Sequence, residues 1–509
     1  MFVKASGQSF EDETQALTKA GPIARSLWIP LLLVGILQAL AGTRYGLFRD
    51  ELYYLACADR LDWAYVDHPG LSVWLLRAVT QIFGDADWVV RSLSGVLALG
   101  SVYAMGFLTA RLGGSRRAVA LAGLVVAAAP VYRVLGLFYS PNTLELMAWI
   151  VVILAWRWCL EPDARGSSWI WLGVAFGLAS ENRLSTPWLL VALFVATVLA
   201  NRRTLWWGPL AAGVTSLALL SPWLLWQWNH HLLTLEFIRN ANSAKLVPIG
   251  PWQFVATQLV VLNVFAAPVW LGAFSQWKQR SEWRPMLAAF LTVAAILILN
   301  GRSRENYLSP AYAFVVPLGS IWLAERLGRW YKGYSVLLVA SGAISALVCM
   351  PMLPPELLAE LIHQLPNPPS VEKGEKGELQ GLGDTIGWPE QVSEVARIWR
   401  TLPPGTPIFA YNYGEASAIL RYGPRLGLPA PICGHNNFWL WSHPAWTGTT
   451  AVLVGRWPAS ITEQFESVVL VPHAPIHYAV PEERDVTIRV ARGFQGDPAR
   501  LGQAIRVIQ

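Results

Sequence analysis

Two acidic residues, Asp50 and Glu51, follow the first long apolar segment of the chain and begin a stretch with apolar residues at helical spacing. A carboxylate within hydrogen-bond reach of a hydroxyl group can accept its proton, which is the task of a general base. Asp is also a common N-cap, and the helix dipole favours acidic residues in a first turn. The pair therefore predicts either a general base or an ordinary helix start, with Asp50 as the N-cap and Glu51 behind it.

A second polar group, Asp67-His68-Pro69, stands in the same loop, just before an amphipathic stretch over Leu71–Phe83 that predicts another helix. A histidine in this place can serve as a phosphate-binding cation, a general acid or a metal ligand. It can equally be a loop histidine in contact with solvent. The sequence leaves these alternatives open.

Three further arginines fall in connections between apolar segments: Arg183, Arg239 and Arg304. Arg304 stands three residues before Tyr307. Ionisable groups beside membrane helices are costly and are functional candidates. The arginine fork matches the geometry of a phosphate, so the set predicts an anionic ligand. Each arginine taken singly is explained as well by snorkelling to lipid headgroups.

Glu145 lies within an apolar segment, where it either lines a substrate cavity or makes a hydrogen bond inside a helix bundle. His230 and His231 are adjacent and so point in different directions on a helix, which argues against a metal pair. The carboxylates and histidines of these loops leave a divalent metal ion open, but no ligand spacing specifies one. Phosphate-loop, dinucleotide, zinc-protease and Cys-x-x-Cys motifs are missing from the sequence, so ATP-driven pumping and dinucleotide chemistry have no support.

The composition places these residues in a membrane protein. Of 509 residues 54% are hydrophobic and only 14% are charged, and the chain has 27 Trp and 15 Tyr, which are typical of membrane–water interfaces. A mean hydropathy of +0.38 excludes an ordinary soluble protein, and four cysteines are too few for a disulfide-stapled scaffold. The net charge of +6 is explained by topology and does not predict a nucleic-acid partner.

A helix needs about 20 mostly apolar residues to cross the hydrocarbon core. Counting apolar windows predicts about eleven transmembrane helices, within 26–43, 92–110, 118–132, 134–156, 166–180, 184–201, 204–229, 246–277, 285–301, 306–324 and 333–355. The even-numbered connections hold thirteen Lys and Arg against four acidic residues. The positive-inside rule therefore predicts a cytoplasmic N-terminus and a C-terminus outside the membrane. It also predicts that polar loop 44–91 and the loop that holds His230, Glu236 and Arg239 lie on the outer side.

The rest of the domain organisation follows from changes in composition. Residues 1–25 are predicted to be a cytoplasmic segment, 26–355 the transmembrane domain and 356–387 a Pro- and Gly-rich linker. Short β-branched runs at 450–455, 468–471 and 486–490, with a helical pattern over 414–422, predict a small extracytoplasmic α/β domain over 388–509. Cys57 and Cys433 both fall on the predicted outer side, which leaves a disulfide open.

The sequence resembles bacterial members of glycosyltransferase family 39, which contains the protein O-mannosyltransferases and the lipid A aminoarabinose transferase. The resemblance covers nearly the whole chain. It rests on Arg49-Asp50-Glu51-Leu-Tyr-Tyr54, Tyr65-Val-Asp67-His68-Pro69, Phe83-Gly84, Arg91, Tyr139-Ser-Pro-Asn142 with Glu145, Pro222-Trp-Leu-Leu-Trp-Gln227, Thr234-Leu-Glu-Phe237, Tyr307-Leu-Ser-Pro-Ala-Tyr312, Asn412-Tyr-Gly-Glu-Ala416 and Gly434-His-Asn436.

The resemblance implies a GT-C membrane fold and transfer of a sugar from a polyprenyl phosphate to an acceptor outside the cytoplasm, with inversion at the anomeric carbon. Carried over by position, Asp50 is the base and Glu51 supports it. The donor phosphate is implied to lie near five residues, and three others are implied to line the substrate cavity. These are His68, Arg183, Arg239, Arg304 and Tyr307 for the phosphate, and Asp67, Tyr54 and Glu145 for the cavity.

Two positions depart from the family pattern. Arg183 replaces a lysine of many relatives, which keeps the charge and changes the hydrogen-bond geometry. Gly70 replaces the second residue of a proline pair, which predicts a looser loop. Both departures leave the donor sugar undetermined.

Two other functions compete with transfer. A flippase or transporter for lipid-linked sugars explains the spans and arginines, but it leaves Asp50-Glu51 without a purpose, and a transporter is expected to place its polar groups near the midplane. A scaffold whose tail binds an envelope partner is the third alternative. The sequence favours a bacterial inner-membrane glycosyltransferase whose acceptor is a lipid, a glycan or a protein hydroxyl.

Overall fold

The computed structural model describes residues 20–162, 164–200, 207–365, 377–442 and 448–509. They form two compact units. The helical unit comprises Met1–Gly42, Arg91–Leu224 and Val247–Met352, described from Ala20 onward, and the mixed unit comprises Thr43–Val90, Leu225–Leu246 and Leu353–Gln509. The mixed unit therefore joins the two polar loops predicted to face outward with the C-terminal tail. Parts of the predicted N-terminal segment and of the linker lie outside the described residues.

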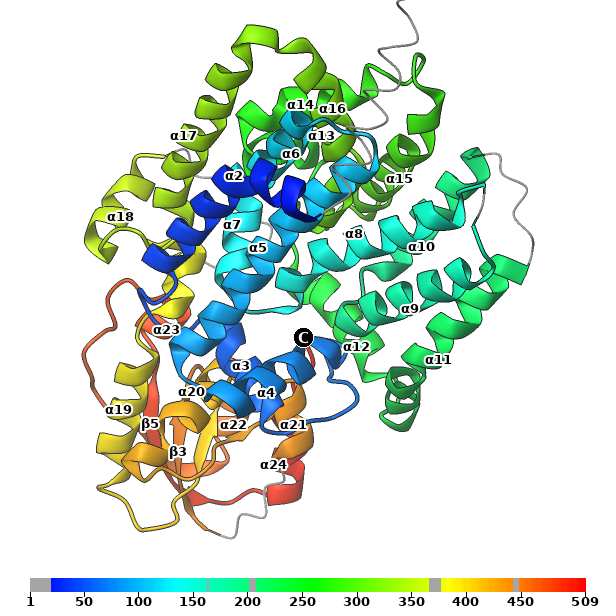
Figure 1. The fold of residues 1–509 in the computed structure, drawn as a ribbon. Coiled ribbons are helices and arrows are strands. Elements are labelled where there is room, and N and C mark those ends of the chain that lie inside the picture. The colour runs from blue at the N-terminus through cyan, green and yellow to red at the C-terminus, as the bar shows by residue number, and fades with distance from the viewer. Residues whose placement is uncertain (1–19, 163, 201–206, 366–376, 443–447) are drawn as a thin grey trace, which may run out of the picture. The chain divides into compact units, whose positions relative to one another are not determined.

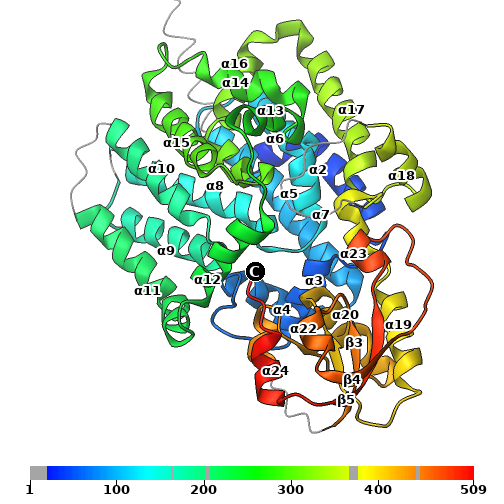
Figure 2. The same ribbon diagram turned by 180° about the vertical axis from the view of Figure 1, so that it is seen from behind.

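The helical unit is a bundle of apolar helices (Figures 1 and 2). Its helices are α2 (Ala20–Ala41), α5 (Asp87–Arg111), α6 (Arg116–Ala128), α7 (Pro130–Leu137), α8 (Pro141–Cys159), α9 (Ser167–Asn182), α10 (Thr186–Leu199), α11 (Trp207–Asn229), α13 (Pro251–Val261), α14 (Ala267–Phe274), α15 (Arg284–Asn300), η4 (Glu305–Phe314), α16 (Val316–Arg326) and α17 (Tyr331–Cys349). α6 packs against α2, α16 and α17, and its residues from Ala118 to Ala128 are buried except for Ala120. The small and branched side chains of α6 therefore form part of the core of the bundle.

The predicted number of eleven spans is not confirmed. Among the described residues six helices are long and apolar enough to cross a membrane, or up to nine if each bent helix pair counts as one span. The pairs α6–α7, α13–α14 and η4–α16 bend by 65°, 93° and 62°. Two predicted windows, 166–180 and 184–201, correspond to α9 and α10, which have only 16 and 14 residues.

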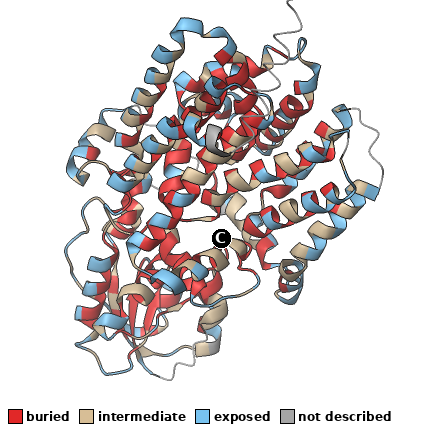
Figure 3. Ribbon diagram, in the orientation of Figure 1, coloured by how far each residue is buried: buried red, intermediate tan, exposed pale blue. Residues whose placement is uncertain are grey.

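The outer surface of this bundle is apolar, as a lipid-facing surface requires. Only 6% of the most apolar window of α11 is buried, and Trp207 and Leu225 are 76% and 62% exposed. Figure 3 shows the contrast between buried central helices and the exposed turns of α11 and α17. The described part of the chain is therefore a membrane-protein fold, as predicted.

The mixed unit contains the predicted sheet. The strand order is β2-β1-β3-β5-β4, with β1 parallel to β2 and β3, and β5 antiparallel to β3 and β4. The strands are β1 (Ile408–Ala410), β2 (Ile432–Cys433), β3 (Thr450–Val454), β4 (Phe465–Leu470) and β5 (Ile488–Phe494). The runs that predicted strands near 450, 468 and 486 thus lie on β3, β4 and β5.

Helices complete the mixed unit. They are α3 (Arg49–Ala58), α4 (Leu71–Phe83), α12 (Leu233–Asn240), α18 (Pro355–His363), α19 (Trp388–Trp399), α20 (Tyr413–Tyr422), α21 (Asn437–Trp441), α22 (Ala459–Thr462), α23 (Pro481–Arg484) and α24 (Pro498–Ala504). α4 has the bounds predicted from its apolar pattern. Leu453 and Phe409 lie in an apolar core with residues of α22 and α24, and α20 packs against α3. Cys57 and Cys433 are buried and free, so the disulfide left open by the sequence is not formed.

Candidate active site

α3 holds the acidic pair in its first turn. Its N-cap is Phe48 in extended conformation, not Asp50, so the N-cap interpretation of Asp50 is wrong. Glu51 is fully buried, and its Oε2 accepts a hydrogen bond from the Phe48 N–H at 2.8 Å, the contact that a capping box makes. Asp50 is half-buried and does not make this capping contact. Glu51 thus supports the helix start, and Asp50 is the carboxylate available for chemistry.

The Asp50 carboxylate has a partner from far along the chain. The Tyr413 hydroxyl donates a hydrogen bond to Asp50 Oδ1 at 2.7 Å. Next to it, Arg49 Nη2 lies 2.5 Å from Asp384 Oδ1, and Glu482 and Glu483 lie 3.7 and 3.9 Å from the same guanidinium. The sequence noted Tyr413 only as part of a motif and missed Asp384. Both contacts join residues more than 330 positions apart, which no local pattern reveals.

A second carboxylate, Asp67, has a tyrosine partner of its own. The Tyr53 hydroxyl lies 2.9 Å from Asp67 Oδ1 and 3.3 Å from Asn437 Oδ1, and Asn437 Oδ1 also accepts from the Val66 N–H at 2.7 Å. Burial raises the pKa of Asp67 above its ordinary value, with His68 opposing and the Asp50 charge adding to the rise. Two carboxylates in unequal environments are a common arrangement in acid–base sites.

His68 is buried among aromatic rings, so the solvent-exposed alternative is wrong. Its Nδ1 lies 2.8 Å from the Pro69 carbonyl oxygen, and its Nε2 lies 3.9 Å from Asp67 Oδ1. The rings of Tyr54 and Tyr65 stand 5.0 and 4.9 Å from the imidazole. Among the predicted site residues, Asp50, Glu51, Tyr54, Asp67 and His68 therefore share the mixed unit around α3.

The loop at Gly70 is closely packed, contrary to the looser loop predicted from the missing proline. A Cβ at Gly70 would lie 2.6 Å from the Trp74 ring and 2.9 Å from the Trp63 carbonyl oxygen. Ala64 and Pro69 form an antiparallel bridge across the loop. Glycine is required here because the Trp74 ring occupies the space of any side chain.

Glu145 lies with two of the predicted phosphate ligands in the helical unit. It is buried on α8 and accepts hydrogen bonds from Arg183 Nη1 and Ser185 Oγ. The Arg183 guanidinium stands 5.5 Å from the centroid of the Tyr307 ring, and that ring is 5.8 Å from the ring of Trp188. Arg183 is therefore already paired with a carboxylate and retains partial exposure, at 21% of its side chain.

The remaining predicted ligands are more dispersed. Arg304 precedes η4 in the helical unit and is half-buried, with its carbonyl oxygen accepting from the Tyr307 N–H at 3.1 Å. Arg239 is exposed on α12 of the mixed unit. Within the described residues no group of three or more His, Cys, Asp or Glu side chains stands where it could hold a metal ion.

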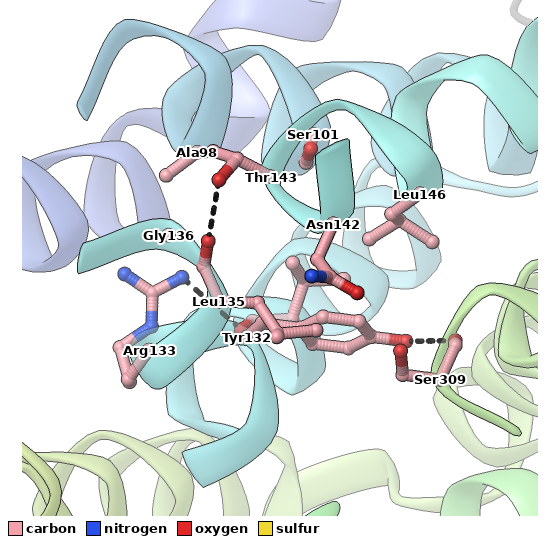
Figure 4. A pocket seen from close by; sticks show the side chains of 11 residues that line it. Ala98, Ser101, Tyr132, Arg133, Leu135, Gly136, Asn142, Thr143, Leu146 and Ser309 are labelled. Carbon is pink, nitrogen blue, oxygen red and sulfur yellow. Dashed lines mark hydrogen bonds between the residues drawn. The ribbon is translucent and has the colours of Figure 1, made fainter. Parts of the chain in front are cut away.

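A small cavity in the helical unit is lined by none of the predicted site residues. Its walls include Tyr132, Arg133, Asn142, Thr143 and Ser309, and it has room for about one water molecule. Figure 4 shows the Tyr132 hydroxyl directed at the Ser309 backbone, to whose carbonyl oxygen it donates at 2.7 Å. The cavity is too small for a sugar.

Comparison with known proteins identifies the chemistry of this chain. A model of the dolichyl-phosphate-mannose-protein mannosyltransferase family matches residues 67–226. Residues 67–226 are therefore similar to that mannosyltransferase family. Of the site residues, Asp67, His68, Glu145 and Arg183 lie inside the matched range.

Two curated relatives are glycosyltransferases as well. The transferase is 23% identical over 414 residues to the lipid A galacturonosyltransferase RgtD of Rhizobium johnstonii, covering 76% of this chain and 84% of that protein. It is 25% identical over 368 residues to the undecaprenyl phosphate-alpha-4-amino-4-deoxy-L-arabinose arabinosyl transferase 1 of Pseudomonas fluorescens, covering 64% of this chain and 60% of that one.

The fold matches a solved transferase along nearly its whole length. The crystal structure of ArnT from Cupriavidus metallidurans bound to undecaprenyl phosphate superposes with a TM-score of 0.59 at 14% identity, over 93% of this chain and 98% of that chain. The predicted GT-C membrane fold with a small C-terminal α/β domain is thereby confirmed. The predicted enzyme class, a glycosyltransferase, is confirmed by the family model and the two relatives.

Proposed function

We propose that the transferase moves a sugar from a polyprenyl-phosphate donor to a hydroxyl of a lipid acceptor on the outer face of the bacterial inner membrane. Both curated relatives are named for lipid-linked chemistry, one for lipid A and one for an undecaprenyl-phosphate sugar. The excess of basic residues in alternate loops supports a cytoplasmic N-terminus and an outer position for the mixed unit.

The observation that carries the proposal is the state of Asp50. It is half-buried in the first turn of α3, and a single phenol holds one of its oxygens. Glu51 is engaged with the helix start, and burial raises the pKa of Asp67, so the position and contacts of Asp50 suit it best to the role of base. In this reaction Asp50 accepts the proton of the acceptor hydroxyl as its oxygen attacks the anomeric carbon from the face opposite the phosphate.

The leaving group is a lipid phosphate, which gains charge as the glycosidic bond breaks. Cationic and hydrogen-bonding groups stabilise such a charge in the transition state. Arg183 and Tyr307 form one such cluster, fixed by Glu145, and Arg304, Arg239 and His68 are further candidates. Because the phosphate already belongs to the donor, no nucleotide site is needed.

The test is sugar transfer in proteoliposomes supplied with radiolabelled undecaprenyl-phosphate sugars and lipid A. We expect Asp50→Asn to lower kcat at least 100-fold, since general-base catalysis contributes about 10²–10⁴-fold. Asp59→Asn is the matched control, because Asp59 lies just beyond the same helix, is exposed and pairs only with Arg77 among the described residues. Transfer that survives in Asp50→Asn would move the base elsewhere, and flipping of labelled lipid without transfer would favour a transporter.

A further inference from the structure

The first turn of α20 lies directly against the first turn of α3 within the mixed unit. Asn412 caps α20 by accepting a hydrogen bond from the Glu415 N–H at 2.9 Å, and this cap fixes where the helix begins. A Cβ at Gly414 would lie 2.7 Å from Arg49 Cγ and 3.0 Å from the Trp388 ring. Only a residue without a side chain allows this approach, which brings the neighbouring Tyr413 to the acidic end of α3.

Consecutive residues of α3 contact the C-terminal part of the chain, Arg49 at Asp384 of the predicted linker and Asp50 at Tyr413 of the C-terminal domain. Arg49 pairs with Asp384 at 2.5 Å, and Asp50 Oδ1 accepts from the Tyr413 hydroxyl at 2.7 Å. The Tyr413 ring contacts two other rings, with its centroid 5.1 Å from that of Tyr53 and 5.0 Å from that of His435. The phenol therefore has little freedom to turn away from the carboxylate.

This contact suits a role in positioning the carboxylate. In the described part of the chain Tyr413 is the only residue that donates to Asp50, and it engages Oδ1, which leaves Oδ2 to accept a proton. Burial and the Asp50 charge raise the pKa of the Tyr413 hydroxyl well above its ordinary value, so the phenol stays protonated and acts as a donor. A hydrogen bond donated to one carboxylate oxygen restricts the rotamer of the Asp50 side chain.

We propose that Tyr413 is a positioning residue for the transfer reaction: its hydroxyl orients the Asp50 carboxylate, so the C-terminal domain completes the active site. This inference rests on the proposed role of Asp50 as the base. It gives the C-terminal domain a direct part in catalysis, beyond any role in binding a partner.

The experiment compares Tyr413→Phe with Tyr411→Phe in the full-length enzyme in proteoliposomes. Tyr411 is a matched control because it lies two residues earlier and packs on Trp457 at 5.6 Å. For Tyr413→Phe we expect kcat to fall about 10–100-fold, because a small displacement of a reacting group lowers the rate by about this factor. The KM for the donor should stay within about twofold, because the phenol does not bind the substrate.

A double variant separates positioning from a purely structural role. The double variant Asp50→Asn/Tyr413→Phe should be no slower than Asp50→Asn alone, because residues that act as a unit are not additive. Gly414→Ala keeps the phenol but forces α20 from α3, and it should lower kcat similarly.

The outcomes distinguish this inference from the proposed function. If Asp50→Asn stays active, the base has been misassigned and the inference fails with it. If Asp50→Asn is inactive while Tyr413→Phe matches Tyr411→Phe in kcat, only the positioning role is overturned. If Tyr413→Phe does not fold, Gly414→Ala with unchanged kcat overturns it.

Discussion

At the scale of single residues, the structure separates carboxylates that look alike in the sequence. Asp50 and Glu51 are neighbours, yet Glu51 turns back to the Phe48 N–H while Asp50 meets the Tyr413 hydroxyl. Glu145 is another acid whose partners decide its role, because it accepts from both Arg183 and Ser185. If Arg183 binds the donor phosphate as proposed, the charge that it offers depends on its contact with Glu145.

Glu145→Gln tests that dependence. We expect the KM for the donor to rise about 3–10-fold and the Tm to fall, because removing one partner of a buried ion pair costs about 3–5 kcal/mol. Glu161→Gln is the matched control, since Glu161 forms an exposed pair with Arg111 at 3.6 Å and exposed pairs contribute about 0–1 kcal/mol. Donor titrations and thermal unfolding measure both effects. An unchanged KM with a lower Tm would remove Arg183 from the donor site.

At the scale of elements, the two polar loops of the mixed unit contain short helices that contact distant segments of the chain. Arg506 makes two hydrogen bonds with Glu236 of α12, at 2.6 and 2.7 Å, and Asn240 donates to the Ile508 carbonyl oxygen at 2.7 Å. Trp226 donates to Asp62 Oδ2 at 2.8 Å. Within the mixed unit, the two polar loops are thus fixed by one another and by the end of the chain.

The start of α3 gives a prediction at this scale. Glu51→Ala should lower the free energy of unfolding of the mixed unit by about 1 kcal/mol, the usual cost of losing a helix cap. Glu51→Gln keeps an oxygen that can accept from Phe48, so it should lower kcat far less than Asp50→Asn does. Thermal unfolding and transfer rates of the two variants provide the comparison. A loss of kcat in Glu51→Gln equal to that in Asp50→Asn would make Glu51 a second catalytic carboxylate.

At the scale of the whole molecule, the sequence predicted what local patterns determine. Apolar windows located helices of the bundle, and the apolar pattern of Leu71–Phe83 gave the bounds of α4. The three β-branched runs overlap the three longest strands without giving their bounds. The count of spans was not confirmed, because α9 and α10 are short and three helix pairs are bent. The pairing of Asp50 with Tyr413 and of Arg49 with Asp384 was out of reach, since a contact across more than 330 residues leaves no periodic trace.

Buried acids in the mixed unit make the stability of the protein depend on pH. Burial raises the pKa of Glu483 to about 7, with Arg49 opposing and Glu482 adding to the rise, and burial also raises the pKa of Asp384. A carboxyl whose pKa is higher in the folded state stabilises the fold fully below the unfolded value, about 4.5 for Glu. That contribution is lost as the pH rises through about 7, because the folded state must then ionise a buried group.

We therefore expect the Tm of the full chain in detergent to fall between pH 5 and pH 8, with each unit of pKa difference worth about 1.4 kcal/mol. Glu483→Gln should flatten this slope, since the amide keeps its contacts with Asn412 and Gln391 but does not ionise. Glu482→Gln is the matched control because its carboxylate is adjacent and 40% exposed, and it should leave most of the slope in place. A slope that is equal in both variants would show that Glu483 ionises in the folded protein without cost, and that the Arg49 pair compensates for its burial.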